Sequence, residues 1–150
     1  MTQQDFIFSF VHPSPEDAAG GRDEIVRKIR QRLQALRSDE QFQVLFPMAV
    51  KSQSVDGLPV LDAALLLKEL GPECAISCEA AVEALLPEWD VSIEEVPFYL
   101  VGRFGARRVR QAIANLEPRV TDKSQRATLD TVSYWIRVYE ETRPQSNSQG

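Results

Sequence analysis

Hydrophobic residues recur at helical spacing along much of this chain. Within residues 22–37 they follow one another at intervals of four, four and three, which places them on one side of a helix. These positions are Ile25, Ile29, Leu33 and Leu36. A second stripe predicts a helix over 121–141 with one side in the core. Its members are Leu129, Val132, Ile136 and Tyr139.

Proline and glycine set the limits of two helices in the middle of the chain. One helix opens at Pro59 and ends at Leu70, because Gly71-Pro72 is a typical stop signal. The next covers residues 73–86 and is closed by Pro87.

Two further helices follow this pair. Ser92-Ile93-Glu94-Glu95 matches a capping box, although Pro97 could move the helix start inward to itself. That helix continues to Gly102 or Gly105, and a basic helix then covers 106–116. The last 90 residues thus contain five helices joined by short breaks.

The first third of the chain is less regular. Residues 6–11 have strand-like composition and form either a docked arm or one edge of a small hairpin. Residues 42–50 fit a helix or a second short strand. Ser38 with Gln41 matches a capping box, and Pro47 limits how far a helix from that point can run.

A length of 150 residues with 43% hydrophobic content fits one domain. We expect a mainly α fold, either an irregular helical bundle or a short helical-hairpin stack, with a short N-terminal β-hairpin or arm as an open addition. The domain is expected to cover residues 1–142, and the polar residues 143–150 to form a disordered tail.

Charge is unevenly distributed along the chain. The net charge is −5, yet residues 39–95 carry twelve acidic and two basic side chains. Residues 22–37 and 103–126 are basic. One interpretation is that these segments attract one another within the fold, and the other is an acidic platform for a basic partner. The negative total argues against nucleic acid as the main partner.

The residue types needed for common catalytic and metal sites are scarce. His12 is the only histidine, and with two cysteines it cannot complete a structural zinc set. Cys74 and Cys78, four residues apart in the expected helix, are interpreted as small core residues, and two cysteines without a disulfide framework indicate the cytoplasm. We therefore expect no enzyme, no cofactor and no metal. No apolar run approaches the ~20 residues that cross a bilayer, so no membrane role is expected.

Binding of another protein is the remaining kind of function, and acidic side chains are the candidate contact residues. Trp89 either caps the core or is an exposed anchor for a partner. The predicted partner-binding residues are Trp89, Asp90, Glu94, Glu95, Glu79 and Glu83.

An alternative function is DNA-binding regulation. Residues 92–116 can form a helix-turn-helix with residues 102–105 as the turn. Arg107, Arg108 and Arg110 would then belong to the recognition helix.

The segment Pro87–Leu100, followed by Phe104-Gly105, resembles small helical bacterial toxin-immunity proteins. The likeness extends at most to Tyr134-Trp135-Ile136 and covers about a third of the chain. Members of this class are cytoplasmic partners that neutralise polymorphic or contact-dependent-inhibition toxins. The resemblance implies a tight complex with a basic toxin domain and no catalysis.

Overall fold

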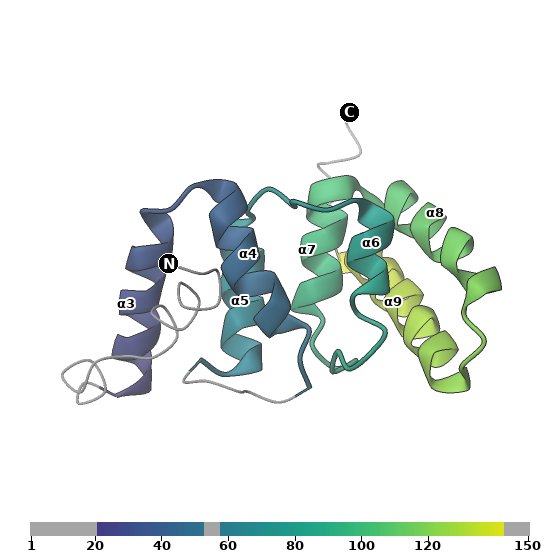
Figure 1. The fold of residues 1–150 in the computed structure, drawn as a ribbon, viewed down its shortest axis with the longest axis horizontal. Coiled ribbons are helices and arrows are strands. Elements are labelled where there is room, and N and C mark those ends of the chain that lie inside the picture. Colours follow the sequence, from purple (N-terminus) through teal and green to yellow (C-terminus); the bar gives the residue numbers. More distant parts are fainter. Residues whose placement is uncertain (1–20, 53–57, 143–150) are drawn as a thin grey trace.

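The computed structural model describes residues 21–52 and 58–142, and this part of the chain is mainly α, without a β-strand. The expected segment 6–11, His12 and the tail 143–150 lie outside the described residues. Figure 1 shows the helices side by side in a row. The elements are α3 (Arg22–Gln34), α4 (Ser38–Ala49), α5 (Val60–Leu70), α6 (Cys78–Glu83), α7 (Glu95–Phe104), α8 (Ala106–Leu116), the 3₁₀ turn η1 (Glu117–Arg119) and α9 (Lys123–Thr142).

Each helix packs mainly on its neighbours in this row. α3 packs on α5, α4 pairs with α5, and α5 packs on α7. α7 also contacts α6, α8 and α9, and α6 packs on α8. Leucine and isoleucine fill the spaces between the helices, because burial there removes their apolar side chains from contact with water. The largest fully buried side chains are Ile29, Leu33, Leu45, Leu58, Leu66, Leu67, Leu85, Leu100, Leu116, Leu129 and Ile136.

The two amphipathic stripes face the core as expected. In α3, Ile29 and Leu33 are buried and the flanking members of the stripe are partly buried. In α9, the first three members of the stripe are buried and Tyr139 is partly buried. α3 ends at Gln34, three residues before the predicted end at Arg37.

Residues 42–49 belong to a helix, so the strand alternative for this segment is wrong. The predicted pairing of Ser38 with Gln41 is also wrong. The Glu40 carboxylate accepts a hydrogen bond from the backbone N–H of Arg37 at 3.1 Å and caps the helix one residue earlier. Gln41 instead donates its side-chain N–H to the Leu33 carbonyl at 2.8 Å, which joins α4 to the end of α3.

α6 is much shorter than the predicted helix over 73–86. The Ser77 hydroxyl accepts a hydrogen bond from the N–H of Ala80 at 3.1 Å and starts the helix at Cys78. Cys74 therefore lies in the preceding loop, and the expected shared helix face of the two cysteines is wrong. Cys78 is buried and Cys74 partly buried, and burial raises the pKa of both thiols.

One glycine separates α7 from α8. Gly102 lies within α7, whereas Gly105 adopts φ 88° and ψ 150°, a conformation that is essentially restricted to glycine. α8 covers Ala106–Leu116, as predicted. The predicted capping box at Ser92–Glu95 does not form, because the Asp90 carboxylate accepts the hydrogen bonds of the Ser92 N–H and hydroxyl, and α7 starts at Glu95.

Candidate protein-binding surface

Aromatic side chains from α7 and α9 meet at the surface. The ring of Phe98 lies edge-on to Trp135 and to Tyr139, with centroids 6.2 and 5.2 Å apart. Tyr134 contacts Trp135 at a centroid distance of 5.0 Å. Such edge-to-face pairs hold aromatic rings in fixed relative positions.

A hydrogen bond ties this cluster to the loop before α7. The indole Nε1 of Trp135 donates to the carbonyl oxygen of Val91 at 2.7 Å. Val91 is 42% exposed and Tyr134 is 48% exposed. The other three side chains are partly buried. We call this surface the aromatic face; it consists of Val91, Phe98, Tyr134, Trp135 and Tyr139.

Three of the predicted binding residues border the aromatic face. Glu94 and Glu95 precede Phe98 by four and three residues, which places them beside it at the start of α7. No cation lies within ion-pair distance of either carboxylate among the described residues. Asp90 directly precedes Val91, and its hydrogen bonds from Ser92 lower the pKa of its carboxyl. The Asp90 carboxyl is therefore ionised at neutral pH.

Trp89 is not part of this surface. It is 4% exposed, and its indole donates to the carbonyl of Ile93 at 3.2 Å. The structure thus shows the core alternative for Trp89, and the exposed-anchor alternative is wrong. The surface tryptophan is Trp135, whose neighbours Ile136 and Tyr139 already belong to the predicted stripe of the last helix.

Glu79 and Glu83 lie apart from the aromatic face, on the short α6. Glu79 accepts a hydrogen bond from Arg119 at 2.6 Å and forms an ion pair with it, while Glu83 is exposed. The structure therefore brings three of the six predicted residues to the start of α7 and the loop before it, and leaves these two elsewhere.

The acidic centre does attract the basic segments on each side. Arg30 of α3 pairs with Glu69 of α5 at 2.8 Å, and Arg119 of η1 pairs with Glu79. These two ion pairs support the first interpretation of the charge pattern. Neither ion pair involves the acids beside the aromatic face. Those acids therefore stay available for the second interpretation, an acidic platform for a basic partner.

The arginines of the predicted recognition helix, Arg107, Arg108 and Arg110, are exposed on α8. Two of them interact with other residues of this chain. Arg110 forms an ion pair with Glu140 of α9, and the guanidinium of Arg108 lies 5.1 Å from the ring centre of Phe104. The predicted four-residue turn over 102–105 is wrong, since Gly105 alone joins the two helices, whereas a helix-turn-helix has a turn of three or four residues. DNA binding stays a prediction from the sequence.

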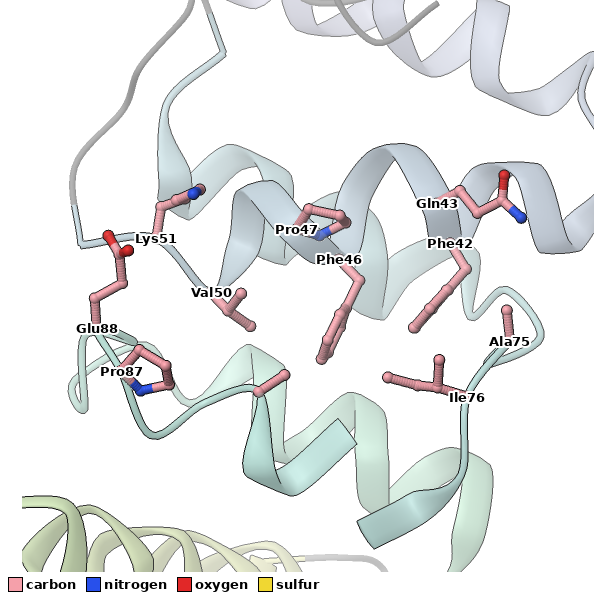
Figure 2. A pocket seen from close by; sticks show the side chains of 11 residues that line it. Phe42, Gln43, Phe46, Pro47, Val50, Lys51, Ala75, Ile76, Pro87 and Glu88 are labelled. Atoms are coloured by element: carbon pink, nitrogen blue, oxygen red, sulfur yellow. The ribbon is translucent and has the colours of Figure 1, made fainter. Parts of the chain in front are cut away.

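An apolar groove lies between α4 and the segments on either side of α6 (Figure 2). Its volume is about 640 Å³. Phe42 and Phe46 stack 4.8 Å apart at its floor, where both are buried, and Ile76 borders it. At one end, the Glu88 carboxylate accepts a hydrogen bond from the Ser52 N–H at 3.1 Å. The groove exposes little of its aromatic floor, so the aromatic face offers the larger anchors to a partner.

The described residues contain no cluster of three or more histidine, cysteine or acidic side chains that could hold a metal ion. Among their helices there is no candidate for a membrane-spanning segment. Comparisons with protein-family models, curated proteins and solved structures find no match for this chain.

Proposed function

We propose that this chain is a protein-binding inhibitor, and specifically an immunity protein that neutralises a basic toxin domain in the cytoplasm. The observation that carries the proposal is the position of Asp90, Glu94 and Glu95 around the aromatic face. Tryptophan and tyrosine are enriched among the few residues that provide most of the binding energy at protein interfaces, and acidic residues beside them favour a basic partner.

The electrostatics of this surface suit such a partner. Glu94 and Glu95 have no internal cation among the described residues, so an approaching lysine or arginine does not have to displace one. Charges at the edge of an interface mainly speed association and exclude wrong partners, while the buried aromatic centre slows dissociation. The two components together suit a tight and selective complex.

The immunity assignment rests on the resemblance of residues 87–105 to toxin-immunity proteins. This segment includes Val91, Phe98 and all three bordering acids, so the resemblance and the candidate surface coincide.

The test takes the product of the open reading frame next to this gene as the candidate toxin. Co-expression of the intact chain should restore growth of cells producing that product, and calorimetry should give a tight complex. The charge-reversed variant Asp90→Lys/Glu94→Lys/Glu95→Lys should bind about 100-fold more weakly, because each reversed charge now repels the partner.

The matched control is Glu83→Lys, which reverses an exposed charge on α6. Helical circular dichroism should be the same for all variants. Unchanged affinity of the triple variant would overturn this placement of the interface, and a neighbouring gene product that is neither toxic nor bound would overturn the immunity function.

A further inference from the structure

The outer side of α5 carries two unusually exposed leucines. Leu61 and Leu65 are 44% and 43% exposed, and they lie one turn apart on the same side of the helix. Among the described residues, the other exposed large hydrophobic side chains are Ile76, Val91 and Tyr134. Two of these three belong to the aromatic face, Val91 in the loop before α7 and Tyr134 on α9, so four of the five exposed side chains lie on α5 or on the aromatic face.

Lys68 connects the leucines to the aromatic face. It follows Leu65 by three residues and therefore continues the same side of α5. Its Nζ lies 5.6 Å from the ring centre of Phe98, which in turn contacts Trp135 and Tyr139. α5 packs on α7 and α7 on α9 (Figure 1), so the apolar surface runs across three helices. We call this surface the apolar strip; it consists of Leu61, Leu65, the stem of Lys68 and the aromatic face.

The α5 end of the apolar strip also contains a hollow. A cavity of about 320 Å³ lies between α3 and α5. Its walls combine apolar and charged side chains, including the ion pair of Arg30 with Glu69: Val26, Arg30, Asp62, Leu65, Leu66, Lys68 and Glu69. A cavity of this size beside exposed leucines suits an anchoring side chain from a partner.

We propose that the apolar strip binds one amphipathic α-helix of the partner, with lysine or arginine beside its apolar stripe. This inference rests on the proposed function and names the part of the toxin domain that is recognised. A helix satisfies its own backbone hydrogen bonds, and the described part of this chain has no strand edge at which an extended segment could pair. Glu94 and Glu95 lie where the strip crosses α7, so they select a basic helix rather than an acidic one.

The test needs no toxin. Two synthetic helices of about 18 residues, or five turns, carry the same leucine stripe with lysine or with glutamate at the remaining positions. They are titrated into the full chain while the indole N–H resonances are followed by NMR. The chain has two tryptophans, Trp135 on the apolar strip and Trp89 in the core. The lysine helix should move the Trp135 indole signal and leave that of Trp89 in place, and the glutamate helix should bind at least ~10-fold more weakly.

Substitutions locate the binding site. Leu65→Glu and, separately, Leu61→Glu should each weaken binding of the lysine helix about 10-fold, because each places a charge in an apolar contact. Ile76→Glu is the matched control, since Ile76 is 39% exposed but borders the groove at α4, and it should leave affinity unchanged. Circular dichroism checks that each variant is folded.

Several results would overturn the inference. One is equal binding of the two helices, and another is loss of binding in Ile76→Glu but not in Leu65→Glu. A third is a chain that forms dimers which Leu65→Glu dissociates, because a second copy would then occupy the apolar strip. If the toxin domain binds through Asp90, Glu94 and Glu95 while Leu61 and Leu65 have no effect, the inference fails and the proposed function stands. If the lysine helix binds as described but no toxin does, the proposed function fails instead.

Discussion

The indole of Trp135 in α9 donates a hydrogen bond to the carbonyl of Val91, 44 positions earlier in the chain. This bond fixes a partly buried aromatic side chain at the surface against the loop that holds Asp90. A surface anchor that is held in place before binding loses less conformational freedom when the partner arrives. The aromatic face is therefore organised in the unbound chain.

The two tryptophans should respond differently to loss of their hydrogen bonds. Trp135→Phe keeps an aromatic ring and leaves the Val91 carbonyl open to water, so the free energy of unfolding should fall by about 1 kcal/mol. Trp89→Phe leaves a gap in the core and deprives the Ile93 carbonyl of its donor, which should cost about 2–4 kcal/mol. Urea unfolding measures both values. An equal or larger cost at Trp135 would contradict this description of the surface.

The two glycines near the α7–α8 junction should respond to alanine with opposite signs. A Cβ at Gly102 or at Gly105 meets no heavy atom within 4 Å, so backbone conformation alone decides. Gly102→Ala replaces a helical glycine and should stabilise the fold by roughly 0.5–1 kcal/mol. Gly105→Ala forces alanine to φ 88° and should destabilise it by about 1–3 kcal/mol. Thermal unfolding measures the change in melting temperature of each variant. A change of the same sign in both variants would contradict this explanation.

Stability should depend on pH through the start of α9. The Asp122 carboxylate accepts hydrogen bonds from the N–H groups of Gln125 and Ser124, and these lower its pKa in the folded chain. Because the pKa is lower when folded, this carboxylate stabilises the fold above about pH 4, and the effect is lost as the pH falls through the lowered pKa. Asp122→Ala should therefore reduce the urea midpoint at pH 7 and have a smaller effect near pH 3. Asp130→Ala, an exposed change on the same helix, is the control for removal of a carboxylate elsewhere on α9.

Buried leucines at the end and at the centre of the row should have different effects. α3 packs mainly on α5, whereas α7 contacts α5, α6, α8 and α9. Leu33→Ala and Leu100→Ala remove the same atoms from fully buried sites. We expect Leu33→Ala to accelerate hydrogen exchange chiefly in α3, and Leu100→Ala to accelerate it throughout the described helices. Uniform acceleration by Leu33→Ala would show that α3 unfolds together with the rest.

Regular spacing explains why the fold class could be predicted from the sequence. The stripes of α3 and α9, the glycine after α5 and the limits of α8 are all local signals, and the structure follows them. The prediction for α6 was wrong for a local reason too. Ser77 caps that helix, with Glu79 in its first turn, so the helix starts at Cys78 and not at residue 73, directly after the stop signal Gly71-Pro72.

The candidate surface could be predicted only in part. Asp90, Glu94 and Glu95 are close in sequence, so their shared position follows from local geometry. Phe98 and Trp135 are far apart in sequence, and only the packing of α9 on α7 brings them together. Nothing local distinguishes Trp89 from Trp135, because both have acidic or aromatic neighbours and differ only in what packs over them.

The ten residues of α7 belong to the core and to the candidate surface at once. Val96, Tyr99 and Leu100 are buried between neighbouring helices, while Phe98 belongs to the aromatic face and Glu95 borders it. If the proposed function is correct, proteins of this fold that bind different partners should therefore differ at the positions of Glu95 and Phe98 and keep the buried residues. Substitutions on one side of a single helix would then change the binding specificity, while the buried side of that helix keeps the fold unchanged.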